Sequence, residues 1–405
     1  MRLFIFDDRV ADGWHPFALT RPCGELRFGT MLLRERLEGY AGVPATATLS
    51  RDWLTSFQEE GAPPAMRRDT RLAEGAHLLL SSRAVPAHGA RFPEDLAEPA
   101  TLRMGDETVG CFVPPGHASP GADWLLDPTA MTGSRDVEVD GSLLRAVWEL
   151  VERNPDRLAA DLASCVEKSS GLPNRVHRIG DGVVLLGRDV ELEPGILLDT
   201  REGGIRLDAG VEVRTGARLQ GPLHVGPGSR LLGGSFSALA AGPMSYLRGE
   251  IEASVVLGYA NKAHDGFLGH AYLGRWVNLG ALTTNSDLKN NYGSVRIGGP
   301  EGDVDTGLLK FGCLLGDHVR TAIGTLLNTG TVVGAGSSLF GPDMPPKWVR
   351  PFSWGSAVEA PAFDRDRFLA TAARVMARRG LELGDPGREW LSACWEAGRG
   401  RGGSA

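Results

Sequence analysis

The chain has 405 residues, of which 42% are hydrophobic and 23% are charged, the balance of an ordinary globular protein. Its net charge of −7 argues against a nucleic-acid-binding protein, which would carry a basic excess. The N-terminus lacks the features of a signal peptide and no long apolar run occurs, so the sequence predicts a cytoplasmic protein without a membrane span.

The first part of the chain has the pattern of an α/β domain, which we place at residues 1–170. Its predicted elements are a buried strand at 3–6, a helix at 29–37, a second buried strand at 77–80 and a helix at 141–166. The first strand ends at Asp7 and Asp8, and ligands of open α/β sheets bind beyond the carboxyl ends of the strands. These carboxylates are therefore candidates for a binding site, or else solvated or capping groups at a strand end.

Beyond Pro173 the pattern changes to apolar residues that recur every six positions. The longest series contains Leu207, Val213, Leu219, Val225 and Leu231; the others contain Ile251 and Leu257, then Leu273 and Leu279, then Leu315, Thr321, Leu327, Val333 and Leu339. A period of six fits neither a helix nor a simple strand, and it predicts a hexapeptide β-helix. Each unit forms a short strand and a corner, three units close one coil, and the apolar residues stack inside. The alternative is an ordinary all-β domain with chance spacing.

We place this β-helix at residues 171–355 and a helical C-terminal tail at 356–405. The breaks between the series are interpreted as loops that leave the coil, at residues 232–250, 258–272 and 284–312. Two amphipathic helices are predicted in the tail, at residues 363–379 and 388–396. We expect them to pack against the coil or against a neighbouring subunit.

The densest polar stretch of the second half lies at residues 258–297. It contains His264 beside Asp265 and Lys262 in a glycine-rich loop, and a β-helix needs none of these side chains for its core. Imidazole is suited to accept a proton from an attacking amine or hydroxyl near neutral pH. The stretch therefore indicates acyl transfer from a thioester, with His264 as general base and with asparagines and backbone N–H groups holding the donor and the oxyanion.

Residues 258–297, together with GDHVRTAIGTLLNTGTVVGAGSSLFG at 316–341, resemble the bacterial bifunctional N-acetylglucosamine-1-phosphate uridylyltransferase/glucosamine-1-phosphate acetyltransferase family. The chain is most similar to a divergent branch with a shortened N-terminal domain, described as sugar nucleotidyltransferases. The segment FDD…LTRPCGELRFGTMLLRE at residues 6–35 also resembles that branch. The resemblance implies a left-handed parallel β-helix, a homotrimer, acetyl-CoA as cosubstrate and an amino-sugar phosphate as acceptor.

The resemblance also implies roles for single residues of the β-helix. His264 matches the catalytic base, and Glu250 and Asn278 match residues of the acceptor site. Ala281 falls at a backbone contact to acetyl-CoA, and the pair Asn291–Tyr292 resembles an Asn–Tyr pair at the same thioester site.

Two positions depart from the family pattern. Glu252 stands where the family has a lysine that contacts the sugar phosphate, and Phe267 stands where it has a tyrosine. Lys262, Lys289 and Arg248 are candidates for the missing positive charge, and Lys262 is the one we assign to the acceptor. The departures bear on the identity of the acceptor more than on the acyl transfer.

The N-terminal part departs further, because it lacks the glycine-rich phosphate loop of standard sugar nucleotidyltransferases. Thr20-Arg21-Pro22 resembles the segment that follows that loop. Asp8, Arg21 and Arg27 are therefore the candidates for binding the nucleotide and the sugar phosphate, and Asp7 is the candidate ligand of Mg²⁺.

Three functional hypotheses follow from these observations. The first is a bifunctional enzyme that uses a sugar phosphate, a nucleoside triphosphate and acetyl-CoA to make a sugar nucleotide of the UDP-N-acetylglucosamine type. The second keeps one of the two activities. The third is a non-catalytic trimeric scaffold, against which the polar loop around His264 argues.

Overall fold

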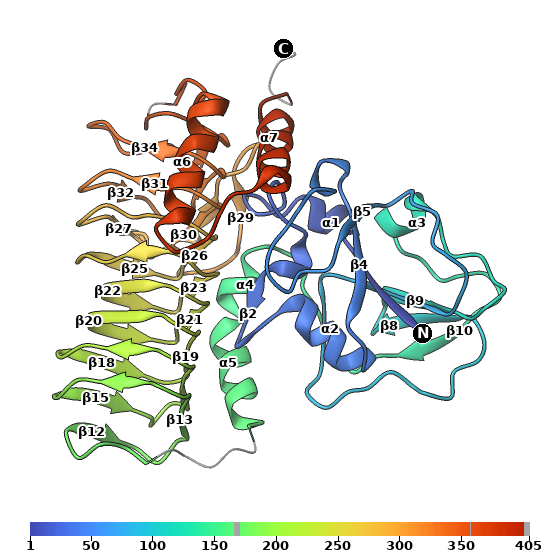
Figure 1. Cartoon of the computed structure of the whole chain (residues 1–405), viewed down its shortest axis with the longest axis horizontal. Coiled ribbons are helices and arrows are strands. Elements are labelled where there is room, and N and C mark those ends of the chain that lie inside the picture. The colour runs from blue at the N-terminus through green and yellow to red at the C-terminus, as the bar shows by residue number, and fades with distance from the viewer. Residues whose placement is uncertain (166–170, 357, 401–405) are drawn as a thin grey trace.

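The computed structural model describes residues 1–165, 171–356 and 358–400 and consists of two parts that pack side by side (Figure 1). An α/β region forms from the N-terminal part of the chain. A long stack of parallel coils forms from the second half, with two helices near its C-terminal end. Among the described helices, none combines the length and apolar character that a membrane crossing requires.

The α/β region is built on a seven-stranded mixed sheet. Its strand order is β10 (Arg135–Glu138), β8 (Ala100–Met104), β9 (Glu107–Val113), β6 (His77–Ser81), β1 (Arg2–Phe6), β4 (Ala45–Ser50) and β5 (Ala65–Arg67). Only β9 runs antiparallel to its neighbours, so the other strands end at one edge of the sheet. The helices of this region are α1 (Arg9–Asp12), α2 (Leu33–Ala41), α3 (Ala122–Leu126), α4 (Glu149–Glu152) and α5 (Asn154–Ala163). Two small antiparallel pairs complete it, β2 (Arg27–Phe28) with β3 (Met31–Leu32) and β7 (Ala84–Pro86) with β11 (Gly141–Leu143).

The two buried strands predicted for this region are confirmed as β1 and β6. The helix predicted at 29–37 begins later, at Leu33, because residues 27–32 form a tight antiparallel pair. The helix predicted at 141–166 is wrong at its start, because residues 141–143 pair with β7 and only α4 and α5 are helical. Its last residue lies outside the described residues.

The second half forms a parallel β-solenoid whose coils have three faces. Face 1 contains β14 (Glu191–Leu192), β17 (Glu212–Val213), the first parts of β20 (Arg230–Ser237) and β22 (Tyr246–Glu252), β24 (Asn261–Lys262), β31 (Arg320–Thr321) and β34 (Ser338–Leu339). Face 2 contains β12 (Val176–Ile179), β15 (Ile196–Asp199), β18 (Ala217–Gln220), the second parts of β20 and β22, β25 (Phe267–Gly269), β27 (Thr284–Asn285) and β32 (Leu326–Leu327).

Face 3 is a nine-stranded parallel sheet that turns toward the α/β region (Figure 1). Its strands are β13 (Val184–Leu186), β16 (Ile205–Leu207), β19 (Leu223–Val225), β21 (Ala240–Ala241), β23 (Val255–Val256), β26 (Tyr272–Leu273), β30 (Cys313–Leu315), β33 (Thr331–Val333) and β35 (Trp348–Val349). The hexapeptide prediction is confirmed, since every residue of the six-spaced series is buried. Most of those residues stack in one continuous interior cluster, as a solenoid requires.

Two of the three predicted loops are wrong. Residues 232–250 and most of 258–272 remain in the coil, and the period of six is lost because corners on both sides of face 2 are shortened in these coils. At Gly233, Gly234 and Gly249 the backbone φ is +93°, +116° and +97°, so the strand turns without extra residues. The third loop is confirmed: residues 286–312 leave the coil and carry the antiparallel pair β28 (Arg296–Ile297) and β29 (Val304–Asp305).

A second core joins the solenoid to the α/β region. The outward side chains of face 3, among them Val255, Tyr272 and Leu314, cluster with apolar residues of the first 28 residues and of α4 and α5. The hydroxyl of Tyr272 accepts a hydrogen bond from the backbone N–H of Arg27 at 2.7 Å. The two parts therefore bury most of face 3 against each other.

The tail forms the two predicted helices, α6 (Arg365–Ala377) and α7 (Asp385–Gly400). They flank the last coils of the solenoid and also reach the α/β region (Figure 1). Phe368 of α6 contacts His318 and Phe352 of the solenoid, and the indole of Trp390 in α7 donates to the carbonyl of Thr20 at 2.8 Å. The tail packs against its own coil, as one of the two sequence interpretations expected.

Candidate functional site

The carboxyl ends of β1, β4 and β6 bring a dense polar cluster together. Asp7 accepts hydrogen bonds from the hydroxyls of Ser50 at 2.5 Å and Ser82 at 2.7 Å, and it pairs with Arg51 at 3.0 Å. Its carboxylate is fully buried and also accepts from the backbone N–H of Cys23. The hydrogen-bonding capacity of the Asp7 carboxylate is therefore already used by groups of the protein itself.

Asp8 is bound in the same way, one position further along. It caps α1 by accepting from the backbone N–H of Ala11 at 2.9 Å, and it pairs with Arg83 at 2.8 Å. The alternative interpretation of the acidic pair, a capping group at a strand end, describes Asp8 well. Within the described residues, no group of three or more His, Cys, Asp or Glu side chains has the arrangement of a metal site. Asp7 and Asp8 thus do not fit a Mg²⁺ site.

Arg21 lies between the two parts of the molecule. Its guanidinium pairs with Glu59 through two bonds of 2.9 Å and with Asp317 of the solenoid at 2.9 Å. Burial opposes its charge, but these two carboxylates outweigh that effect and raise its pKa. Arg21 therefore stabilises the contact between the α/β region and the solenoid, and the structure does not bring it to a phosphate site.

Arg27 is also buried in this interface. Its guanidinium donates to the carbonyl of Thr30 at 2.6 Å, while its Nε has no hydrogen-bond partner. Burial lowers its pKa. The sequence-predicted phosphate ligands Asp8, Arg21 and Arg27 are thus held in internal contacts rather than around one open pocket.

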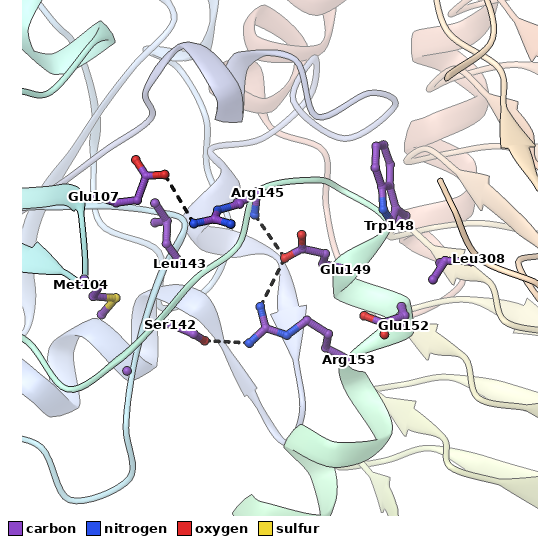
Figure 2. A pocket seen from close by; sticks show the side chains of 12 residues that line it. Met104, Glu107, Ser142, Leu143, Arg145, Trp148, Glu149, Glu152, Arg153 and Leu308 are labelled. Carbon is purple, nitrogen blue, oxygen red and sulfur yellow. Dashed lines mark hydrogen bonds and ion pairs between the residues drawn. The ribbon is translucent and has the colours of Figure 1, made fainter. Parts of the chain in front are cut away.

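An open pocket does exist at the same edge of the sheet (Figure 2). It lies beyond the carboxyl end of β8, which runs parallel to β1 and β6. The cavity has a volume of about 590 Å³, within the range of small-molecule sites. Its lining comes from the β8–β9 turn, from β11, from α4 and from Leu308 of the solenoid loop.

The pocket is lined by charges of both signs. Arg153 donates to Ser142 at 2.8 Å and to Glu149 at 3.2 Å, and Arg145 pairs with Glu107 at 3.5 Å. Trp148 offers an aromatic surface at the solenoid side of the pocket (Figure 2). These lining residues are not among the predicted site residues, because the apolar spacing of residues 141–166 indicates only a helix. The available signal was the series Arg145, Glu149 and Arg153, four residues apart.

The second candidate site lies on the solenoid, at the corner between faces 1 and 2. His264 is exposed there, in the turn between β24 and β25, and its ring makes no hydrogen bond to any described residue. A nearby imidazole, His270, differs because its Nδ1 lies 2.7 Å from the carboxylate of Asp287. His264 is therefore free to meet a substrate, whereas His270 is held by the protein.

Lys262 supports the turn that presents His264. Its side chain is buried, and its ammonium donates to the backbone carbonyls of Arg248 at 3.0 Å and His264 at 2.8 Å. Burial lowers the pKa of Lys262 to about 8, against the opposing attraction of Asp265. Lys262 thus positions the turn, and its amine does not point to the solvent where an acceptor phosphate would arrive.

The next coil places two predicted residues beside this corner. Asn261 pairs with Asn278 across a separation of 17 residues, and its side-chain amide donates to the Asn278 side chain at 2.9 Å. The same separation relates His264 to Ala281, which therefore occupies the equivalent position one coil further on. The structure thus brings His264, Asn278 and Ala281 onto two successive coils.

The other predicted residues lie farther from the corner that holds His264. Glu250 is exposed on face 2, opposite Phe267 of the next coil. Asn291 and Tyr292 are exposed in the loop that leaves face 2 at its other end, toward face 3. Within one chain, the structure does not bring this pair to the corner that holds His264.

Large aliphatic side chains stand in solvent next to the corner. Leu282, Ile323 and Leu326 are exposed to 59%, 77% and 50% of their surfaces. Leu282 follows Ala281 directly, and Ile323 occupies the matching position one coil beyond Ala281. Grouped apolar surface of this kind usually marks a contact with a ligand or another chain.

The N-terminal part of the chain matches one known family. Residues 3–170 are similar to the sugar nucleotidyl transferases. The match covers the polar cluster at the strand ends and all residues that line the pocket of Figure 2 except Leu308. A comparison of the whole chain with curated proteins gave no match. The α/β region is therefore sugar nucleotidyl transferase-like in sequence and in its mixed sheet.

Proposed function

We propose that this protein is a transferase of sugar-nucleotide synthesis whose solenoid acetylates an amino-sugar phosphate with acetyl-CoA. The observation that carries the proposal is the exposed imidazole of His264 on a solenoid corner, which makes no hydrogen bond to any described residue. Lys262 fixes its turn, and Asn278 and Ala281 lie on the next coil. A scaffold would not need a proton acceptor held in this way.

The proposed reaction uses His264 as general base. The amine nitrogen of the acceptor attacks the acetyl carbon, its bond to that carbon forms, and the carbon–sulfur bond of the thioester breaks. His264 takes the proton that the amine loses and then gives it to the departing thiolate, so that free CoA leaves. Removing a positioned general base costs about 10²–10⁴-fold in rate.

The exposed aliphatic residues at the corner support a site shared between chains. Most of face 3 is covered by the α/β region and part of face 1 by the C-terminal tail, so another copy would contact mainly face 2 and the rest of face 1. A homotrimer would cover Leu282, Ile323 and Leu326 and bring Asn291 and Tyr292 of a neighbouring chain to the site. The trimer and the acyl-CoA contacts of these residues are part of this proposal.

The α/β region carries the second activity that we propose, sugar-1-phosphate nucleotidyl transfer. The family match of residues 3–170 and the cavity of about 590 Å³ at the ligand-binding edge support it. A sugar phosphate oxygen would attack the α-phosphorus of a nucleoside triphosphate and release pyrophosphate. We place this ligand against Trp148, Arg145 and Arg153 rather than at Asp7 and Arg21, whose contacts are already complete.

Two assays test the proposal. Free CoA is measured with acetyl-CoA and glucosamine 1-phosphate, and pyrophosphate is measured with UTP or dTTP, Mg²⁺ and a sugar 1-phosphate. We expect His264→Ala to abolish CoA release and to leave pyrophosphate release near wild type. His177→Ala, an exposed histidine in β12 far from the corner, is the matched control.

Each outcome bears on one half of the proposal. Wild-type CoA release in His264→Ala would refute the general-base role. Arg153→Gln is expected to lower pyrophosphate release and spare CoA release, with the exposed Arg135→Gln as control. Equal pyrophosphate release in both arginine variants would remove the pocket of Figure 2 from the nucleotidyl-transfer site.

A further inference from the structure

A separate cavity lies between face 1 of the solenoid and the end of helix α6. It has a volume of about 210 Å³. The solenoid contributes an outward ladder on successive coils, in which Tyr246, Asn261, Asn278 and Arg320 follow one another in register. Val375, Arg378 and Arg379 of the tail line its other side. The cavity therefore exists only because the tail packs on the coil.

The charged residues that line this cavity are three arginines, and among the described residues of the lining none is acidic. Arg320 is half-buried, and its guanidinium makes no hydrogen bond or ion pair with any described residue. Burial lowers the pKa of Arg320, as expected for a cation without a counter-charge. Burial also lowers the pKa of Arg379, further lowered by the neighbouring charges of Arg378 and Arg230.

Aromatic rings complete the lining. Tyr259 and Trp276 stack with their centroids 4.4 Å apart, and both residues have positive φ, +54° and +63°. The guanidinium of Arg379 lies over the ring of Tyr246 at 3.6 Å. The same left-handed conformation recurs at this corner in other coils, at Met244, His318 and Phe352, so it belongs to the regular geometry of the solenoid corner.

We propose that this cavity binds a small phosphorylated molecule, with Arg320 and Arg378 on its phosphate and with Tyr259 and Trp276 beside its ring. Guanidinium groups match phosphate oxygens in charge and geometry. Several unneutralised arginines favour a phosphate over a single carboxylate. A volume of about 210 Å³ holds a phosphate with one ring and is too small to enclose a whole nucleoside triphosphate.

The C-terminal tail closes the site, since α6 contributes Val375 and the residues directly after the helix, Arg378 and Arg379, supply two of the arginines. Asn261 and Asn278 also line the cavity, and a hydrogen bond of 2.9 Å joins their side-chain amides. The aromatic pair lies at the corner between faces 3 and 1, whereas His264 lies at the corner between faces 1 and 2. The two sites have Asn278 in common, but the arginines and the aromatic pair of this cavity take no part in the proposed acyl transfer.

Calorimetric titration of the full chain at low salt tests the inference with three probes. Inorganic phosphate reports the anion alone, glucosamine 1-phosphate reports a sugar phosphate, and adenosine 3′,5′-bisphosphate reports a nucleotide fragment. We expect one ring-bearing probe to bind at least tenfold more tightly than inorganic phosphate, which identifies the source of the phosphate. Absence of heat with all three probes would overturn the inference.

Substitutions of single arginines test whether the probe binds in this cavity. Arg320→Gln and Arg378→Gln are each expected to weaken the best probe at least tenfold. Arg374→Gln, one turn earlier on α6 and outside the cavity, should bind as the wild type does. Because Arg378 is exposed, its variant keeps the test valid if Arg320→Gln fails to fold.

One control separates the two proposals. His264→Ala should retain full affinity for the best probe, whether or not it has lost CoA release. Unchanged affinity in both Arg320→Gln and Arg378→Gln would show that the probe binds elsewhere and would refute the inference.

Discussion

The two polar regions of this molecule look alike in sequence and differ in structure. At the strand ends of the α/β region, Asp7 and Asp8 are bound by Arg51, Arg83 and serine hydroxyls until no capacity remains. At the solenoid corner, the ring of His264 makes no hydrogen bond or ion pair with any residue that the structure describes. The comparison teaches that unused bonding capacity, rather than the density of polar residues, marks a site for a ligand.

The first prediction tests the exposed imidazole at the solenoid corner. Replacing His264 with alanine is expected to lower the rate of CoA release by about 10²–10⁴-fold, because a positioned general base contributes that much. The thermal midpoint should stay at the wild-type value, since the side chain is exposed and its ring makes no hydrogen bond to any described residue. A large loss of stability would contradict the exposed position of His264.

The second prediction tests the buried charges of the α/β region, whose partners lie within the protein. Asp317→Asn removes the solenoid partner of Arg21 and leaves a buried guanidinium with one carboxylate, Glu59. We expect a loss of about 3–5 kcal/mol in the free energy of unfolding, measured by urea denaturation. Glu212→Gln, at a half-exposed pair with Arg230, is the control and should cost about 0–1 kcal/mol. Equal losses of unfolding free energy in the two variants would contradict the distinction between a buried and a half-exposed ion pair.

The third prediction concerns the seam between the two regions. Tyr272→Phe removes the hydroxyl that binds the backbone of Arg27 on both sides, at 2.7 and 3.2 Å. A buried N–H is left without a partner, which costs about 1–3 kcal/mol. Tyr292→Phe, at a side chain exposed to 70%, should leave the urea midpoint unchanged. A neutral result for Tyr272→Phe would mean that the seam contributes little to stability.

The fourth prediction is a pH effect. Burial lowers the pKa of His318 to about 3, whereas an unfolded histidine titrates near 6.5. The unfolded chain therefore binds the extra proton first, and stability is lost as the pH falls from about 6.5 toward 3. This residue contributes a slope of up to about 1.4 kcal/mol per pH unit in that window.

His318→Phe should remove that part of the slope while keeping the ring contacts with Trp276 and Phe368. A phenylalanine already occupies the equivalent corner two coils on, at Phe352 with φ +55°. Urea unfolding at pH 7 and pH 5 measures the difference. His224 and His77, whose pKa values are also lowered by burial, keep a residual slope in the variant. Parallel pH curves for the two proteins would contradict the prediction.

Local periodicity determined much of the fold from the sequence. The interior of a solenoid coil depends on which residues recur along the chain, so the series from Leu207 to Leu231 predicted it directly. Short apolar strands and amphipathic helices are likewise local patterns, which is why β1, β6, α6 and α7 agree with the prediction. The polar stretch around His264 was visible for the same reason, because a solenoid core has no use for it.

Only the tertiary structure decided how those pieces use their remaining groups. The outward residues of face 3, such as Val255 and Tyr272, look like exposed rungs until the α/β region covers them. Arg21 looks like a phosphate ligand until Asp317, almost 300 residues away, is found beside it. Hydrogen bonds and ion pairs between distant segments follow from chain packing and not from local spacing. Local sequence thus determines which polar groups exist, and packing determines which of them are left free to bind.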